Sequence, residues 1–251
     1  MIDTFAPPGY ESFLVGRAQV VAQAALAGDV RAAMAGATLH EWAARQPGAQ
    51  AMQGRATAWA TRFSGGTEVV VRHSRHGGLL APITGDLFLA PTRAPRELAA
   101  ALRLAAAGVP TPKVLAYALY PAMGPFARAD VATALLRGIA LPEAWPVTLT
   151  VDESWLLVEA IATLLAALRQ AGAHHPDLNV RNVLILDRPD APAAAVLDVD
   201  RVVFGAPGDS GLAAQNLRRL LRSMAKAHVG FRRNLTSRQV QRLRDVTGGS
   251  W

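Results

Sequence analysis

Apolar and polar residues follow different patterns in the two halves of the chain. In the first half, Glu68–Arg72 (EVVVR) is rich in β-branched residues, which predicts a strand. Two prolines just before Val114–Tyr117 favour an extended backbone leading into a second strand. Arg93–Ala107 is rich in alanine and leucine and ends at a glycine, which predicts a helix. The first half is therefore expected to form a small sheet with one main helix.

The segments on either side of this region are less regular. Ala18–Ala35 has apolar residues at mixed spacings of three and four, which predicts a helix. Ala127–Leu136 is expected to be a strand, although its alanines would also suit a helix. Glycine and proline then interrupt the pattern within Leu136–Pro142, where we predict a boundary between two lobes. The predicted lobes are residues 1–138 and 139–251.

The second half is expected to be mostly helical. Asp152–Gln170 and Leu212–His228 both predict helices, and the latter has an apolar seam opposite a basic face. Between them lie two short apolar segments, Asn182–Leu186 and Ala194–Val199. Their connection contains two prolines and two aspartates, which predicts a β-hairpin.

Polar residues flank this hairpin in the stretch His174–Asp200, HHPDLNVRNVLILDRPDAPAAAVLDVD. Asp177 follows a helix in a loop, where its carboxylate can accept the proton of an incoming hydroxyl group. Asn182 begins the first strand, and the antiparallel return of the hairpin should bring Asp198 beside it. Amide and carboxylate oxygens suit Mg²⁺ bound to phosphates. The stretch therefore predicts a phosphoryl-transfer centre with Asp177 as the base and Asn182 and Asp198 as metal ligands.

Each of these residues alone would be a weak signal, because an aspartate before a strand is often only a cap or a turn residue. The ordered combination with a hairpin between its members is far more specific. His175 is expected to pack or hydrogen-bond within the loop. Zinc binding by His174 and His175 is disfavoured, since adjacent histidines do not easily share a metal. Asp200 would either bind the cation too or cap the segment that follows.

This pattern resembles the catalytic loop and metal-binding segment of the protein-kinase-like superfamily. His175, Asp177 and Asn182 match its His-x-Asp-x4-Asn motif, and Asp198 stands at the position of its metal-binding aspartate. Within it, the chain most resembles the lipopolysaccharide kinase family, and there the kinases of 3-deoxy-D-manno-octulosonic acid (Kdo). The resemblance covers roughly residues 54–222 and is carried by VVVRHSRHGGLLAPITGDLFL (Val69–Leu89), TRAPRELAAALRLAAAGVPTPKVLA (Thr92–Ala116), RADVAT (Arg128–Thr133) and HPDLNVRNVLI (His175–Ile185).

The resemblance implies an α+β, bilobal protein-kinase-like fold, with a small β-rich N-terminal lobe and a mostly helical C-terminal lobe. It also implies ATP and Mg²⁺ as cofactors. Gly54, Arg72 and Glu97 would form the nucleotide site in the N-terminal lobe, with Glu97 as the ion-pair partner of Arg72. The family carries arginine where most protein kinases have lysine, and a guanidinium group can bind phosphate through two hydrogen bonds.

Three features depart from the usual kinase pattern. The glycine-rich phosphate loop is reduced to Gln53–Trp59, in which Gly54 alone remains of the glycines. No acidic hinge pattern stands in Ala134–Glu153, so the residues that contact adenine are not predicted. Only about ten residues separate Asp200 from the next helix, which leaves no room for the long activation segment of a protein kinase. The acceptor is therefore expected to be a sugar, a lipid or another small hydroxyl compound.

Composition restricts where the protein acts and what it binds. The 251 residues are 51% hydrophobic and 18% charged and include no cysteine, as expected of a globular protein in a reducing compartment. There is neither a signal-peptide pattern at the start nor an apolar run long enough to span a membrane, so a cytoplasmic location is expected. The net charge of +7 is concentrated after Asn216, which suggests contact with nucleic acid, an anionic membrane surface or a phosphorylated substrate, or simply a solvated basic face.

The leading hypothesis is an ATP-dependent kinase that phosphorylates Kdo of Kdo-lipid A at the cytoplasmic face of the inner membrane. The glycolipid or sugar would be its substrate, and Arg218, Arg219, Arg222, Arg232 and Arg233 would attract the membrane. A small-molecule kinase of the aminoglycoside class and a pseudokinase that only binds are the alternatives. Nucleic-acid binding is not expected, because few aromatic residues accompany the basic C-terminal region. The sequence does not indicate an oligomeric state.

Overall fold

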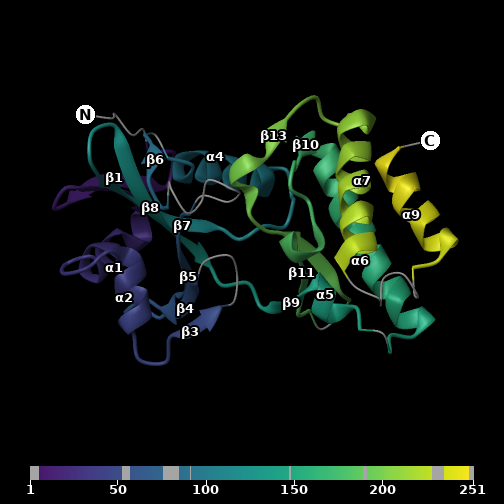
Figure 1. Cartoon of the computed structure of the whole chain (residues 1–251), viewed down its shortest axis with the longest axis horizontal. Coiled ribbons are helices and arrows are strands. Elements are labelled where there is room, and N and C mark those ends of the chain that lie inside the picture. Colours follow the sequence, from purple (N-terminus) through teal and green to yellow (C-terminus); the bar gives the residue numbers. More distant parts are fainter. Residues whose placement is uncertain are drawn as a thin grey trace. The chain divides into compact units, whose positions relative to one another are not determined.

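The computed structural model describes residues 6–52, 57–75, 85–90, 92–146, 148–188, 191–227 and 235–248. The chain forms two compact units (Figure 1). Unit 1 contains the residues up to Leu98 together with Lys113–Leu135. Unit 2 contains Ala99–Pro112 and the residues from Leu136 onward. Each is described by itself below.

Unit 1 is built on an eight-stranded sheet in which every neighbouring pair of strands is antiparallel. The strand order is β1-β2-β7-β8-β5-β4-β3, and β6 pairs with β8. The expected strands at Glu68–Arg72, Val114–Tyr117 and Ala127–Leu136 are present as β5, β7 and β8. The strands are β1 (Tyr10–Val15), β2 (Ala18–Gln23), β3 (Gln50–Met52), β4 (Ala58–Arg62), β5 (Glu68–His73), β6 (Phe88–Leu89), β7 (Val114–Pro121) and β8 (Phe126–Ala134).

Short helices cover one face of this sheet and close its core. They are η1 (Ala24–Leu26), α1 (Ala27–Ala33) and α2 (Leu39–Arg45). Thr38 and Glu41 form a capping box at the start of α2, which satisfies backbone N–H groups there. Val69 and Val71 of β5 are fully buried in the same apolar cluster as Leu39 of α2. The longer helix expected in the first half is α4 (Ala94–Ala106), which ends just before Gly108. Its residues up to Leu98 belong to unit 1 and those from Ala99 onward to unit 2.

The helix expected over Ala18–Ala35 was a wrong prediction for its first part. Ala18–Gln23 is the strand β2, which pairs with β1 on one side and β7 on the other. Val20, Val21 and Ala22 are all buried, so side chains on both faces of this strand are apolar. A strand buried on both faces reads as a continuous apolar run and lacks the alternation that distinguishes it from a helix. Only Ala27–Ala33 is α-helical.

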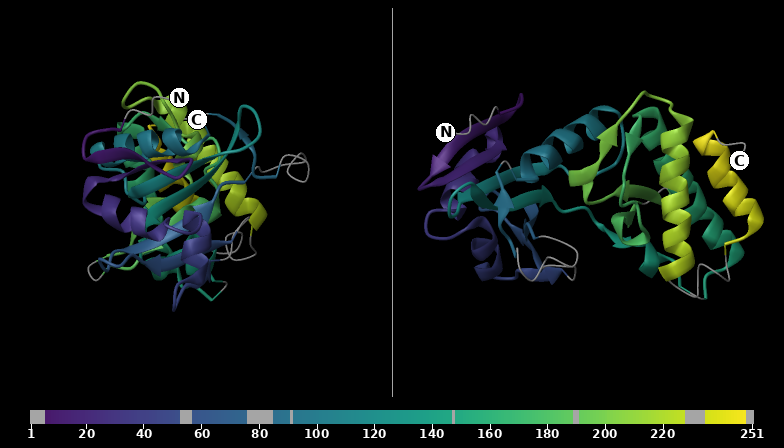
Figure 2. Two further views of the ribbon diagram at one scale, coloured as in Figure 1. Left: turned by 90° about the vertical axis from the view of Figure 1, so that its left-hand side faces the viewer. Right: turned by 45° about the horizontal axis from the view of Figure 1, so that its top comes forward.

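Unit 2 is mostly helical, as expected. Its long helices are α6 (Val151–Gln170), α7 (Ser210–Ala227) and α9 (Ser237–Thr247), and α5 (Leu141–Ala144) is a single turn. Figure 2 shows α6, α7 and α9 side by side. Between α6 and α9, Gln239 donates a buried hydrogen bond of 2.8 Å to Ser154. No helix in the described part of the chain is long and apolar enough to cross a membrane.

Two small sheets complete unit 2. The predicted hairpin is formed by β11 (Val183–Leu186) and β12 (Ala193–Val196), and β9 (Gly138–Ala140) pairs with the other edge of β11. The second sheet joins β10 (Ala173–His174) to β13 (Val203–Phe204). The 3₁₀ turns η2 (Val180–Asn182) and η3 (Val199–Arg201) precede β11 and follow β12. Both ends of the hairpin are therefore held in short, defined turns.

Candidate active site

The loop that carries Asp177 begins at a sharp turn after α6. Gly172 ends the helix with a φ of 61°, in the left-handed region. A Cβ atom at this position would lie 2.6 Å from the carbonyl oxygen of Ala206, so that only glycine fits here. Gly205 in turn donates a backbone hydrogen bond of 2.9 Å to the Gly172 carbonyl. The turn thereby fixes where the loop starts.

Two asparagines hold the backbone of Asp177. Its carbonyl oxygen accepts hydrogen bonds from Asn179 Nδ2 at 2.9 Å and from Asn182 Nδ2 at 2.8 Å. Asn182 thus uses its amide nitrogen within the loop. Its amide oxygen has no protein partner among the described residues. The nitrogen therefore closes the loop, while the oxygen keeps its capacity to bind a cation.

The hairpin brings the segment of Asp198 back to Asn182. Val183 pairs with Val196, and one residue farther on Leu197 N donates a hydrogen bond of 2.9 Å to the Asn182 carbonyl. Asp198 comes directly after this contact and is exposed. The antiparallel return predicted from the sequence is therefore present.

Asp198 has an unusual backbone conformation. It is the one non-glycine residue in the described part of the chain with a positive φ, with φ 58° and ψ 55°. Aspartate tolerates this left-handed conformation better than most residues, but such outliers persist mainly at functional sites. Within the described residues its carboxylate has no hydrogen-bond or ion-pair partner. The carboxylate is therefore available to an external ligand.

His175 ties the Asp177 loop to the Asp198 segment. Its ring is fully buried. Nδ1 accepts a hydrogen bond from Asp177 N at 3.2 Å, and Nε2 lies 3.0 Å from the carbonyl oxygen of Leu197. These partners fit the tautomer with its proton on Nε2. The prediction that His175 hydrogen-bonds within the loop is confirmed, and the contact also reaches the residue before Asp198.

The free oxygens of Asn182 and Asp198 fit a magnesium ion. Mg²⁺ keeps several waters and takes one or two protein oxygens together with substrate phosphates. The described residues contain no group of three or more His, Cys, Asp or Glu side chains that could hold a metal by themselves. An ion here would therefore be shared with a nucleotide, which is the use predicted from the sequence.

One face of α7 supports the loop at residues that sequence analysis did not single out. Asn216 is buried, accepts a hydrogen bond from His175 N at 2.9 Å and donates one to the Ala173 carbonyl at 2.8 Å. Ser223 Oγ accepts a hydrogen bond from Val180 N at 3.1 Å. Asn216 could have been identified from the sequence, because it is a polar residue directly beside the apolar seam of the helix. A polar side chain buried there needs hydrogen-bond partners.

Arg219 lies on the same helix and contacts the predicted base. Its Nη2 donates a hydrogen bond of 3.1 Å to Asp177 Oδ1. Sequence analysis assigned this arginine only to the basic surface. The contact places a fixed positive charge at the predicted proton acceptor.

In unit 1, Arg72 of β5 forms the predicted ion pair with Glu97 of α4. The side chain of Glu97 is almost fully buried, and the side chain of Arg72 is 29% exposed. Arg72 therefore presents part of its side chain to solvent while Glu97 fixes the rest. Gly54, the third residue predicted at the nucleotide site, lies outside the described residues, as do Arg232 and Arg233.

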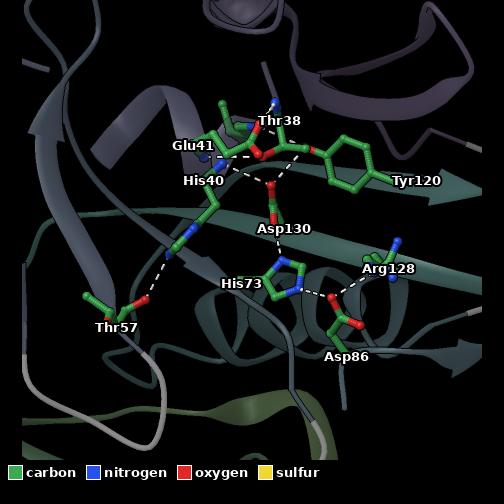
Figure 3. A network of polar contacts seen from close by, with 10 residues as sticks. Thr38, His40, Glu41, Thr57, His73, Asp86, Tyr120, Arg128 and Asp130 are labelled. Atoms are coloured by element: carbon green, nitrogen blue, oxygen red, sulfur yellow. Dashed lines mark hydrogen bonds and ion pairs between the residues drawn. The ribbon is translucent and has the colours of Figure 1, made fainter. Parts of the chain in front are cut away.

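Two of the motifs quoted above meet in a polar network behind Arg72. His73 and Asp130 stand opposite each other on β5 and β8, with His73 Nδ1 2.6 Å from Asp130 Oδ1 (Figure 3). His73 Nε2 lies 3.0 Å from Asp86, which also accepts a hydrogen bond of 2.7 Å from Arg128. Successive side chains of a strand point to opposite faces, so His73 anchors β5 on the face away from Arg72.

Asp130 also holds the start of α2. It is fully buried and accepts hydrogen bonds from His40 N at 2.9 Å and from the Tyr120 hydroxyl at 2.8 Å (Figure 3). That hydroxyl accepts in turn from Leu39 N at 2.8 Å. Burial and the neighbouring Asp130 raise the pKa of Tyr120, which keeps its hydroxyl protonated as a donor. The network joins β5, β7, β8 and α2.

We expect this network to make the stability of the protein depend on pH. The hydrogen bond to Asp130 raises the pKa of His73 above its ordinary value of 6.5. A raised folded-state pKa gives stability that is fully present below the unfolded-state value and is lost as pH rises through the folded-state pKa. His73→Gln should therefore lower the free energy of unfolding by urea more at about pH 6 than at about pH 9.

His174 in unit 2 provides a control with the opposite sign. Burial lowers the pKa of His174, so its contribution to stability falls as pH drops below the unfolded-state value. His174→Gln should then become relatively less destabilising, or even stabilising, at the lower pH. If the loss of unfolding free energy depended on pH in the same way in both variants, the raised pKa of His73 would be contradicted.

The chain is similar to proteins of known family. The lipopolysaccharide kinase (Kdo/WaaP) family matches residues 40–246. A 3-deoxy-D-manno-octulosonic acid kinase of Vibrio parahaemolyticus serotype O3:K6 is 30% identical over 194 residues, which cover 74% of this chain and 74% of the relative. Another, from Xylella fastidiosa strain 9a5c, is 28% identical over 202 residues, with 79% and 78% covered.

A solved structure shares the fold. The structure of WaaP in complex with acyl carrier protein matches with a TM-score of 0.57 at 20% sequence identity. The match covers 85% of this chain and 83% of that one. At this level of identity the likeness concerns the fold, and it confirms the kinase-like α+β fold predicted above.

Proposed function

The chain belongs to the lipopolysaccharide kinase (Kdo/WaaP) family, and we propose that it uses ATP to phosphorylate a hydroxyl group of Kdo in Kdo-lipid A. The observation that carries this proposal is the arrangement of Asp177, Asn182 and Asp198 around the buried His175. Relatives named as Kdo kinases support the choice of acceptor. Unit 1 would bind the nucleotide through Arg72, and unit 2 would bind the acceptor.

In the proposed reaction, the oxygen of the acceptor hydroxyl forms a bond to the γ-phosphorus of ATP. The bond from that phosphorus to the bridging oxygen breaks, and ADP leaves. Asp177 accepts the hydroxyl proton and orients the oxygen for attack. Mg²⁺, when bound by Asn182 and Asp198, would neutralise charge on the phosphate oxygens. Arg72, held by Glu97, would bind phosphate oxygens of the nucleotide.

The short chain segment after Asp198 supports a small acceptor. It forms η3 and β13, and α7 already begins at Ser210. A protein kinase docks its peptide on a long activation segment at this place. A sugar acceptor does not need that segment.

The experiment that tests the function is an assay of ATP consumption and product mass with acceptors of two classes. Kdo-lipid A and free Kdo represent the proposed substrate, and aminoglycosides represent the alternative class. Turnover with Kdo compounds alone supports the proposal. Turnover with aminoglycosides alone would assign a different kinase activity, and nucleotide binding without any turnover would indicate a pseudokinase.

Arg72→Lys should retain part of the activity, whereas Arg72→Ala should lose most of it. Lysine keeps a positive charge for the phosphates but lacks the planar pair of donors. We expect KM for ATP to rise in Arg72→Lys while KM for the acceptor changes little. Arg62→Lys is a matched control, because Arg62 pairs with the partly exposed Glu68 on the same sheet. Unchanged kinetics in Arg72→Ala would remove Arg72 from the nucleotide site.

We also propose that the basic C-terminal region attracts anionic membranes. Arg218 and Arg222 are exposed on α7. Each basic residue near an anionic surface contributes about 1 kcal/mol, and salt screens the attraction. Binding to anionic vesicles should therefore fall with added salt and in Arg222→Ala. Arg45→Ala, which removes an exposed arginine from α2, should bind like the unmodified protein. Equal binding to neutral and anionic vesicles would contradict the proposal.

A further inference from the structure

One face of α7 contacts the Asp177 loop at three positions. The outer two bind backbone groups, whereas the middle one binds a side chain. Asn216, Arg219 and Ser223 follow a spacing of three and four residues, which places them on one face of the helix. Asn216 and Ser223 bind backbone groups of the loop. Arg219 instead binds the side chain of Asp177, at 3.1 Å. Backbone support by the flanking residues positions the loop, so Arg219 is not needed for that purpose.

Arg219 is also not explained by stability. Its side chain is 46% exposed and that of Asp177 is 23% exposed. Ion pairs exposed to this degree contribute little to folding, because solvent screens them and long side chains lose conformational freedom. Arg219 Nη2 donates to Asp177, while its other N–H groups have no partner within the described ranges. A guanidinium group with a free edge therefore lies beside the predicted base.

The free edge suits an anion carried by the acceptor. A hydroxyl group that gives its proton to Asp177 must lie within hydrogen-bond distance of that carboxylate, and so close to Arg219. A guanidinium group binds a carboxylate through two parallel hydrogen bonds. The pKa of His174 is lowered first by burial, then by the adjacent His175, and also by the positive charge of Arg219. The electrostatic field of Arg219 therefore reaches other side chains around the loop.

We propose that Arg219 binds the carboxylate of an acid-sugar acceptor and thereby selects acidic sugars over neutral ones. This inference rests on the proposed function, because it places the acceptor at Asp177. Arg219 bridges Asp177 and the carboxylate, which sets the distance between the acid group of the sugar and the hydroxyl that is phosphorylated. The charge of Arg219 is thus part of the acceptor site and not of the membrane-facing surface.

The test compares an acid sugar with its neutral analogue. Binding of free Kdo and of its carboxamide is titrated in the presence of Mg²⁺ and a non-hydrolysable ATP analogue. The unmodified protein should bind Kdo about 10- to 100-fold more tightly than the carboxamide, as expected for hydrogen bonds to a charged group. Arg219→Ala should lose affinity for Kdo by a similar factor and lose little for the carboxamide. Turnover assays should show the same change in KM for the acceptor, with KM for ATP unchanged.

Lys226→Ala is the matched control. Lys226 is an exposed cation seven residues along the same helix, two turns away and on the same side. Its removal should leave both affinities unchanged. Loss of affinity for Kdo in both variants would show a general effect of charge and overturn the proposal.

The remaining outcomes separate this inference from the proposed function. If the unmodified protein binds Kdo through Arg219 but does not phosphorylate it, the proposed function fails and the assignment of Arg219 stands. If Arg219→Ala weakens Kdo and the carboxamide equally, or if the unmodified protein does not distinguish them, Arg219 does not bind the carboxylate. If Kdo is phosphorylated and either of these binding results is obtained, the proposed function stands and only the inference about Arg219 is overturned.

Discussion

Asp177→Ala should lower the rate of phosphoryl transfer by about two to four orders of magnitude, the usual contribution of a positioned general base. The loop that holds Asp177 is fixed through its backbone, since the Asp177 carbonyl accepts from Asn179 and Asn182. Removal of the carboxylate should therefore leave the loop in place. Nucleotide affinity should barely change, because the carboxylate acts on the acceptor hydroxyl and not on the phosphates.

Both quantities can be measured on one preparation, by turnover and by nucleotide titration. Asp187→Ala provides the control, because Asp187 is an exposed aspartate at the end of β11 in the same hairpin. It should keep normal turnover. A near-normal rate of phosphoryl transfer in Asp177→Ala would contradict the assignment of Asp177 as the general base. Loss of nucleotide binding would instead indicate a structural role.

Asp198→Asn should abolish phosphoryl transfer while the protein stays folded. The substitution removes the negative charge that a magnesium ion requires and keeps the size of the side chain. Asparagine also tolerates the left-handed backbone conformation found at Asp198, so the turn after β12 should survive. The expected loss is at least as large as that for Asp177→Ala, because both the ion and the nucleotide phosphates depend on this carboxylate.

The folded state can be checked by circular dichroism and urea unfolding, and Mg²⁺-dependent nucleotide binding by titration. Asp198→Asn should lose the effect of Mg²⁺ on nucleotide affinity. Asp187→Asn, the same change at an exposed position of the hairpin, should keep it. Turnover close to normal in Asp198→Asn would show that this segment does not hold the ion.

The local geometry of the candidate site could be predicted from the sequence because its members are close together in the chain. Asp177, Asn182 and Asp198 lie within a stretch of a loop and one hairpin, where turn residues and apolar runs determine the geometry. The same holds for the strand and helix that carry Arg72 and Glu97, since their patterns are regular and the family resemblance supplied the pairing. The functions of these residues remain predictions.

Other features depended on residues that are far apart in the chain. Ala18–Gln23 is a strand because β1 and β7 bury both of its faces, which its own periodicity does not reveal. His73 and Asp130 became partners through the register of β5 and β8. No spacing along the chain indicates that Arg219 would meet Asp177, which lies 42 residues earlier. Local patterns in the sequence thus predicted the helices α4, α6 and α7, the hairpin and the closeness of the Asp177 loop to the Asp198 segment. Packing of α7 against that loop decided which of several surface arginines contacts Asp177.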